Sequence, residues 1–511
     1  MSYFESYLRY DEIFTLTLIK DTLPNIIKLT AMDVHPPLHY FIVKAFVYFG
    51  QEILHLPFDS IYLGEISSAI PFLLLMVFSY FYLRRDIGWL SAGLFSFSLI
   101  SMPQMIFYSG DIRMYPWGML FTTLSFYMAY KITITDTSNK NSYKYYLLLI
   151  FFTVCGAYTQ YYCSVAILGV YFVLFTYLTL NNDIKKIKRL ILSGIISVVS
   201  FLPWIPTLIQ QTHYVSNSFW IGEFNAETLF NSIIYFLSAT KIGETTWTLL
   251  GSPEGLDLPF LSSLLIVLIL VSIHYLFKGK YSVEIVRNRL LKVNFLTYGA
   301  LIILFEVFTG MLASNIIGKP ILHVRYLVIG IALFWLSVSM IIGKTYHLKN
   351  KSIFLSLFIL FVVGGLISSY YGFHILGENN KLTQLMKDDY KLIGSNDLII
   401  DTDLTVTGWR ELFKHHSDDN TLISSLDSYW EPPYYRVYSS RHDMSVFKRD
   451  KFERINNTLN HGDKVWISGG IDGDGLQRLF QELMVLKDYR YGYLDPYYVK
   501  KHHVLIEIGK K

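Results

Sequence analysis

The stretch "YLVIGIALFWLSVSMIIG", residues 326–343, carries no charged side chain. An apolar run of about 20 residues is long enough to cross the hydrocarbon core of a bilayer as a helix. Similar runs recur along the chain, which has 511 residues and is 52% hydrophobic but only 16% charged. This composition excludes an ordinary soluble protein of this length and predicts a polytopic membrane protein.

The other apolar runs set the number of membrane spans. We predict about ten spans, near 65–83, 88–108, 115–131, 145–162, 164–180, 190–209, 259–277, 293–316, 326–343 and 352–373. A shorter helix near 37–50 precedes the first span. An amphipathic segment near 229–239 is expected to rest at the membrane interface.

The basic residues of the connecting loops predict the orientation. One set of alternate loops is rich in Lys and Arg, from Arg84 and Arg85 through the lysines of 131–144 and 185–188 to Lys344, Lys349 and Lys351. The other set carries only Arg113, Lys241, Lys319 and Arg325. Cytoplasmic loops are the basic ones. Residues 1–64, 109–114, 210–258, 318–325 and everything after 374 should therefore lie outside, in a multi-pass protein of the plasma membrane.

The tail differs from the rest of the chain. Residues 375–511 are polar and contain strand-like runs, "DLIIDTD", "KVWISGG" and "HHVLIEIG", together with a helical pattern at 476–486. The predicted fold class is therefore mainly α: a polytopic transmembrane helix bundle in residues 1–374, with a small extracytoplasmic α/β domain in 375–511.

Charged residues recur at predicted helix starts on the outer side. They are Asp11 and Glu12, Asp33 and His35, Asp111 and Arg113, and Arg325. The free N–H groups and the dipole of a helix N-terminus favour an anion. These residues therefore predict a phosphate site at the lipid–water boundary, where a carboxylate could act as a general base or hold a metal.

Each of these residues also has a purely structural interpretation. Adjacent acids are common in solvated turns, and Asp33 with His35 before two prolines could cap a helix. Asp111 and Arg113 could form a local ion pair, and Arg325 could anchor its helix at the interface. Glu306 lies near the middle of a span, where a carboxyl is costly unless it is paired or faces a wet cavity.

Three short motifs carry a resemblance to a known family. "DEIF" at 11–14, "DVHPPLHY" at 33–40 and "YSGDIRMY" at 108–115 resemble, in order and spacing, the polytopic glycosyltransferases of the C superfamily. The nearest type is family 39, which includes relatives of the protein O-mannosyltransferases and of the lipid A aminoarabinose transferase. "FLPWIPTLI" at 201–209 and "RYL" at 325–327 are also similar, so the resemblance covers about residues 1–345.

The resemblance implies a reaction and a set of site residues. The donor would be a sugar, possibly mannose-like, on a polyprenyl phosphate, and the acceptor a hydroxyl of a protein, lipid or glycan. Asp11 would be the base for an inverting transfer, with Glu12 and Asp111 as further catalytic acids. The residues expected to bind the lipid phosphate or substrate are Asp33, His35, Arg113, Tyr115 and Arg325.

The resemblance does not decide the cofactor, and the sequence departs from the family pattern at two points. Members differ over a divalent cation such as Mg²⁺ or Mn²⁺, which Asp11 and Asp111 would hold. No nucleic-acid partner is expected. Only ten residues precede Asp11, too few to cross a bilayer, so we expect that either the gene start is misplaced or the usual first span is missing. Gln160 stands where relatives often have His.

A transporter or flippase of a lipid-linked glycan is the alternative function. Such a protein should show inverted repeats and interrupted helices near the midplane of the membrane. The sequence shows neither pattern, and its acids gather on one side of the membrane instead. A glycosyltransferase is therefore the leading hypothesis.

Overall fold

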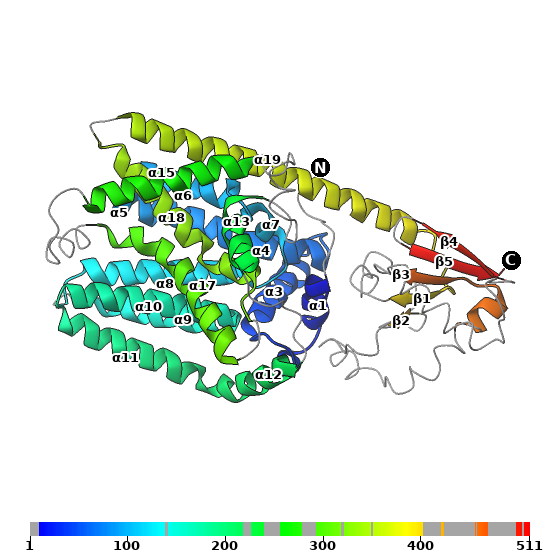
Figure 1. Ribbon diagram of the computed structural model, residues 1–511. Helices are drawn as coiled ribbons and strands as arrows, with labels where there is room; N and C mark the ends of the chain where they lie inside the picture. The colour runs from blue at the N-terminus through cyan, green and yellow to red at the C-terminus, as the bar shows by residue number, and fades with distance from the viewer. Residues whose placement is uncertain are drawn as a thin grey trace. The chain divides into compact units, whose positions relative to one another are not determined.

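The computed structural model describes residues 10–137, 142–217, 226–239, 256–277, 293–317, 321–348, 351–401, 421–423, 455, 457–468, 497–502 and 505–510. Helices dominate this part of the chain, and a small sheet lies near the C-terminus (Figure 1). The structure thus confirms the predicted fold class, a mainly α polytopic bundle with a small sheet region.

Every predicted span overlaps at least one helix. In chain order these are α4 (Ser60–Phe78), α6 (Trp89–Ser101), α8 (Tyr115–Ile134), α9 (Ser142–Thr159), α10 (Tyr161–Leu180), α11 (Ile184–Phe201), α15 (Asp257–Phe277), α17 (Ala300–Ile317), α18 (Val328–Thr345) and α19 (Lys351–Tyr390). Before them come α1 (Tyr10–Leu18), α2 (Leu23–Ala31) and α3 (Leu38–Tyr48). The shorter elements are η1 (Phe49–Ile53), η2 (Ser79–Leu83), α5 (Arg84–Ile87), α7 (Met105–Gly110), η3 (Leu202–Trp204), α12 (Ile205–Asn217), α13 (Ala226–Leu237), η5 (Phe295–Gly299) and η6 (Val324–Leu327).

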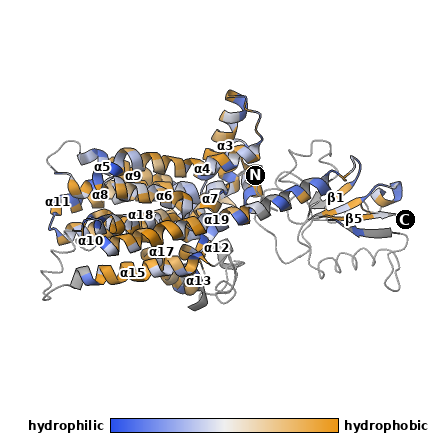
Figure 2. Ribbon diagram, turned by 90° about the horizontal axis from the view of Figure 1, so that it is seen from above, coloured by the Kyte–Doolittle hydropathy of each residue, from blue (hydrophilic) through white to orange (hydrophobic). Residues whose placement is uncertain are grey.

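Seven helical segments in the described ranges are long and apolar enough to cross a membrane, which makes the chain a multi-pass membrane protein (Figure 2). α8 is outside this set although it has 20 residues. Most of its side chains, including Thr122, Thr123 and Ser125, are buried inside the protein. A helix surrounded by protein needs less apolar surface than one that faces lipid.

The span predicted at 88–108 is two helices rather than one. α6 ends at Ser101, and α7 begins at Met105. Pro103 lies between them, and the residue before a proline is pushed away from helical backbone angles. Met102 accordingly has an extended backbone, and Gln104 adopts left-handed angles with φ of 68°.

α18 lies at the centre of the helical packing. It contacts α6, α8 and α17. Of its membrane-crossing window, 83% is buried, compared with 22% for the window that includes α11. A glycine allows one close approach: a Cβ atom at Gly299 would lie 2.7 Å from the backbone oxygen of Leu333.

The C-terminal sheet has the strand order β2-β1-β3-β5-β4. Its strands are β1 (Leu398–Asp401), β2 (Thr421–Ile423), β3 (Val465–Ser468), β4 (Tyr497–Lys501) and β5 (Leu505–Lys510). β1 pairs in parallel with β2 and β3, while β5 pairs antiparallel with β3 and β4. The three predicted strands are confirmed as β1, β3 and β5. The helix predicted at 476–486 lies outside the described residues.

The chain divides into two compact units. The helical unit contains residues Val34–Val43 and Glu65–Ile375, and the second unit contains Met1–Asp33, Lys44–Gly64 and Leu376–Lys511. The domain boundary predicted between 374 and 375 falls within α19, which continues as one helix to Tyr390. That boundary stays a prediction.

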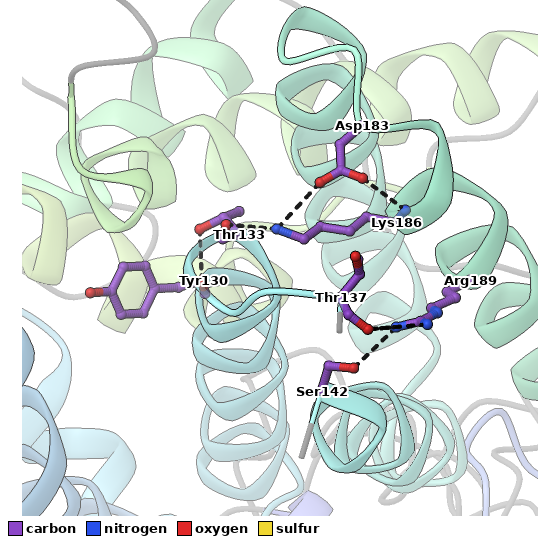
Figure 3. Close-up of polar contacts among 7 residues, drawn as sticks. All are labelled: Tyr130, Thr133, Thr137, Ser142, Asp183, Lys186 and Arg189. Carbon is purple, nitrogen blue, oxygen red and sulfur yellow. Dashed lines mark hydrogen bonds and ion pairs between the residues drawn. The ribbon is translucent and has the colours of Figure 1, made fainter. Parts of the chain in front are cut away.

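α5, which carries Arg84 and Arg85, lies at the same end of the helical unit as the end of α8 and the start of α11, which carry Lys131, Lys186 and Arg189 (Figure 1). We call this the basic end. Figure 3 shows how its cations are held. Lys186 donates to the Thr133 backbone oxygen at 3.0 Å and lies 3.4 Å from the Asp183 carboxylate. Arg189 donates to the Thr137 backbone oxygen and to the Ser142 hydroxyl. These bonds tie α11 to the connection between α8 and α9.

A second contact at the basic end joins α5 to α8. The Asp86 carboxylate accepts hydrogen bonds from the Tyr127 hydroxyl at 2.7 Å and from the Lys131 ammonium at 2.9 Å. The side chains of Asp86 and Lys131 are only 16% and 20% exposed, so water screens the pair weakly. The contact therefore contributes to the packing of these two helices.

Candidate functional site

The candidate site begins at His35, just before α3. Pro36 and Pro37 follow it, and α3 begins at Leu38. Proline lacks the N–H that the first helical turn leaves without a partner, so the pair suits this position. The predicted helix start is confirmed, and His35 lies buried beside it.

Asp111 and Arg113 lie in the short connection between α7 and α8. α7 ends at Gly110, Asp111 has an extended backbone, and α8 begins at Tyr115. The Arg113 N–H donates to the Asp111 backbone oxygen at 2.6 Å. Both side chains are 4% exposed, so the connection holds a guanidinium and a carboxyl inside the protein.

His35 and Arg113 meet although 78 positions separate them in the chain. The Arg113 guanidinium nitrogen lies 3.1 Å from His35 Nε2. A guanidinium can only donate, so Nε2 must accept, and the imidazole proton resides on Nδ1. His35 is thus held as a neutral ring beside a permanent positive charge.

His39 joins this pair from the first turn of α3. It is fully buried. Burial is the largest cause that lowers its pKa well below the ordinary value, and the charge of Arg113 adds to the effect. His39 is therefore neutral, like His35. The residues predicted for the site did not include His39, although it lies in the same motif as His35, "DVHPPLHY".

Hydrogen bonds to a third segment, α13 and the residue after it, support this connection. The Tyr108 hydroxyl is hydrogen-bonded to the Tyr235 hydroxyl of α13, and the Gln104 amide donates to the Ser238 backbone oxygen at 3.2 Å. The predicted site residue Tyr115 packs edge-to-face on Tyr108 with ring centroids 5.3 Å apart. α13, which matches the amphipathic segment expected near 229–239, is thereby fixed against α7 and the connection that carries Arg113.

Arg325 lies in η6, at the start of α18. The His323 ring accepts a hydrogen bond from the Arg325 backbone N–H at 3.2 Å. The next residue, Tyr326, packs on Tyr162 with ring centroids 4.5 Å apart. Gln160, the departure from the family pattern, caps the start of α10 by accepting from the Tyr162 backbone N–H. In this structure Gln160 has a helix-capping role.

Glu306 is fully buried in α17. Neither of its carboxyl oxygens has a hydrogen-bond partner within the part of the chain that the structure describes. Glu306 was expected either to be paired or to face a wet cavity. Pairing with a described side chain is not observed.

The remaining predicted residues belong to the second unit. Asp11 and Glu12 form the first turn of α1, where acids favour the positive end of the helix dipole. Glu12 is 3% exposed, and Asp33 is 8% exposed just after α2. The structure thus brings together His35, His39, Asp111 and Arg113. A shared site with Asp11, Glu12 and Asp33 stays a prediction.

The divalent cation that Asp11 and Asp111 would hold stays a prediction. Among the described residues, no group of three or more His, Cys, Asp or Glu side chains could hold a metal ion. The described side chains of this site are one guanidinium, two imidazoles and a carboxyl. Such a set can bind an anion through charge and directed N–H donors.

No family model matches the chain, and no curated protein matches it. Among solved structures, it is similar to ArnT from Cupriavidus metallidurans bound to undecaprenyl phosphate, with 10% identity, a TM-score of 0.42, and coverage of 93% of this chain and 87% of that one. It is also similar to the archaeal oligosaccharyltransferase AglB from Archaeoglobus fulgidus in complex with an inhibitory peptide and a dolichol-phosphate. That match has 11% identity, a TM-score of 0.42, and coverage of 92% and 66%. Similarity at this level assigns no function, so the side chains of the site must carry the proposal.

Proposed function

We propose that this protein is an integral membrane glycosyltransferase that transfers a sugar from a polyprenyl-phosphate donor to a hydroxyl acceptor on the outer face of the membrane. The observation that carries this proposal is the buried contact between Arg113 and the neutral ring of His35. The order and spacing of the motifs around Asp11, His35 and Arg113 support it.

The site residues fit the charge changes of the reaction. As the bond between the anomeric carbon and the phosphate oxygen breaks, negative charge develops on the departing lipid phosphate. Arg113 would stabilise that charge most strongly, because buried charged donors act in a medium of low dielectric constant. His35 can donate through its protonated Nδ1.

The acceptor side of the reaction needs a base. Asp11 would accept the proton of the acceptor hydroxyl as the oxygen attacks the anomeric carbon from the face opposite the phosphate, with inversion of configuration. Glu12 and Asp111 are the further acids assigned to the site, and Asp33, Tyr115 and Arg325 the further residues assigned to substrate binding. A mannose-like sugar is the proposed donor group.

The direct test is sugar transfer by membranes that contain the protein. Such membranes would be incubated with a panel of polyprenyl-phosphate sugars, and transfer to acceptors followed by mass spectrometry. Asp11→Asn keeps the size of the side chain but removes its basicity, so transfer should fall by about 10²- to 10⁴-fold while membrane insertion is unchanged. A fully active variant would remove Asp11 from the role of base.

A transporter or flippase would give a different result in the same system. In proteoliposomes it would move the lipid-linked sugar between leaflets and form no glycosylated product. Product formation without a requirement for net movement of the donor supports the transferase.

A further inference from the structure

The second unit contains a cavity whose lining includes none of the residues assigned to sugar transfer. Its volume is about 180 Å³, and it is formed by the end of α1, the second half of α3 and η1. Its lining is both apolar and charged: Leu16, Ile19 and Val47 on one hand, and Lys20, Lys44 and Glu52 on the other. None of these residues belongs to the set assigned to the donor phosphate or to the catalytic acids.

The cations of this cavity outnumber its acids. Lys44 is half-buried, and its ammonium donates to the Ile19 backbone oxygen at 2.7 Å, which holds it at the end of α1. An ammonium has three donors, so this bond leaves donors for a ligand. Lys20 lines the same cavity from the turn just after α1, and Glu52 is the acid in the lining. This charge balance favours an anion.

A run of exposed apolar side chains adjoins the cavity. η1, which supplies Glu52, is followed by a turn, and the two segments expose Phe49, Ile53, Leu54 and Phe58. Ile53 and Leu54 are 53% and 51% exposed. Water-facing surfaces rarely show so many large apolar side chains in one short stretch, so this stretch is expected to meet lipid chains.

The position of the run beside the cavity is fixed by packing. Gly50 is buried within η1, where a Cβ atom would lie 2.8 Å from the Leu63 side chain in α4. A larger residue at this position would force the end of the Leu63 side chain to shift, so η1 packs closely against α4. The apolar run therefore projects from a fixed base next to Lys44 and Glu52.

We propose that this cavity binds the anionic head group of a membrane lipid, whose chains lie along the exposed apolar side chains of residues 49–58. Lys44 and Lys20 bind the head group, and Leu16, Ile19 and Val47 contact the first part of the lipid chains. The proposal stands on the second unit alone and does not depend on the assignment of sugar transfer.

The test is lipid binding to the purified full chain in detergent, measured by native mass spectrometry with phosphatidylglycerol and with phosphatidylcholine. We expect retention of phosphatidylglycerol over phosphatidylcholine. Lys20→Gln and Lys44→Gln should each weaken phosphatidylglycerol binding about fivefold. Lys28→Gln is the matched control, because Lys28 is an exposed lysine of α2 that does not line the cavity.

A second pair of variants tests the chain-binding surface. Leu54→Ser should weaken phosphatidylglycerol binding, whereas Leu23→Ser, at a position with the same 51% exposure in α2, should not. Because Lys44 also holds the end of α1, the thermal unfolding of Lys44→Gln would be measured alongside. Lys20→Gln provides the test if that variant unfolds.

Three outcomes would overturn the proposal. Equal retention of the two phospholipids would remove the selectivity for an anion. Equal weakening by Lys28→Gln and Lys20→Gln would show a general effect of charge. Full competition by inorganic phosphate, with no effect of Leu54→Ser, would show a site for a free anion rather than a lipid.

Discussion

The two ends of α8 hold cations in different ways. The helix has 20 residues, so its ends lie about 30 Å apart. At the basic end, Lys131 donates to the Asp86 carboxylate, and Lys186 meets a backbone oxygen and a carboxylate. At the other end, the guanidinium of Arg113 is hydrogen-bonded to the neutral ring of His35.

From this difference we infer a structural role for the cations of the basic end and a functional role for Arg113. A cation bonded to a carboxylate is largely neutralised and serves to join helices. At the other end, the structure places the guanidinium of Arg113 beside the buried imidazoles of His35 and His39, a set of N–H groups that can bind an anion. We therefore assign ligand binding to the Arg113 end and assembly to the basic end.

The largest expected effect comes from removing the positive charge of the Arg113 guanidinium. Arg113→Gln should lower kcat/KM for sugar transfer by about 10²- to 10³-fold, as the loss of a main donor to a developing anion does. Arg113→Lys should restore part of the rate, because an ammonium keeps the charge but lacks the fork of the guanidinium. Steady-state kinetics with a fixed acceptor measures both. Equal rates for wild type and Arg113→Gln would detach this residue from the phosphate.

A smaller effect, on stability rather than on rate, is expected at the basic end. Asp86→Ala leaves the Lys131 ammonium and the Tyr127 hydroxyl without their shared acceptor. The free energy of unfolding should fall by about 1–3 kcal/mol, the range for losing hydrogen bonds to a charged group. Thermal unfolding in detergent measures the change. The rate of sugar transfer below the unfolding temperature should stay that of wild type, and a loss of rate without a loss of stability would break the distinction between the two ends.

The smallest effect concerns pH at the Arg113 end. The lowered pKa of His39 means that the unfolded chain binds a proton near pH 6.5 while the folded protein does not. Stability is thus fully present above about pH 6.5 and falls below it by at most about 1.4 kcal/mol per pH unit, until the folded pKa is reached. Unfolding of wild type and His39→Gln would be compared at neutral and mildly acidic pH. His39→Gln should lose less stability on acidification, and equal losses would contradict the buried neutral ring.

Much of the fold could be predicted from the sequence because membrane spans are long and local. Each predicted span overlaps at least one helix, and the strands β1, β3 and β5 overlap the predicted runs. The break between α6 and α7 was missed, although Pro103 is its local cause. Here the length of the apolar run outweighed the proline in the prediction.

The site was predictable only in part, for a physical reason. His35 and Arg113 could be named because each sits in a polar motif at a helix start. The roles of His39, Tyr108 and Tyr235 depend on contacts between distant segments, which no local pattern encodes. The same holds for Asp86, whose partners Tyr127 and Lys131 lie more than 40 positions away.

The most direct test of the central claim is the affinity of the purified protein for a polyprenyl phosphate, compared between two variants that each remove one positive charge from opposite ends of α8. The account predicts that Arg113→Gln weakens binding at least about tenfold. It predicts that Lys131→Gln leaves the affinity unchanged while lowering the unfolding temperature. Equal affinities for the two variants would contradict the assignment of phosphate binding to the Arg113 end.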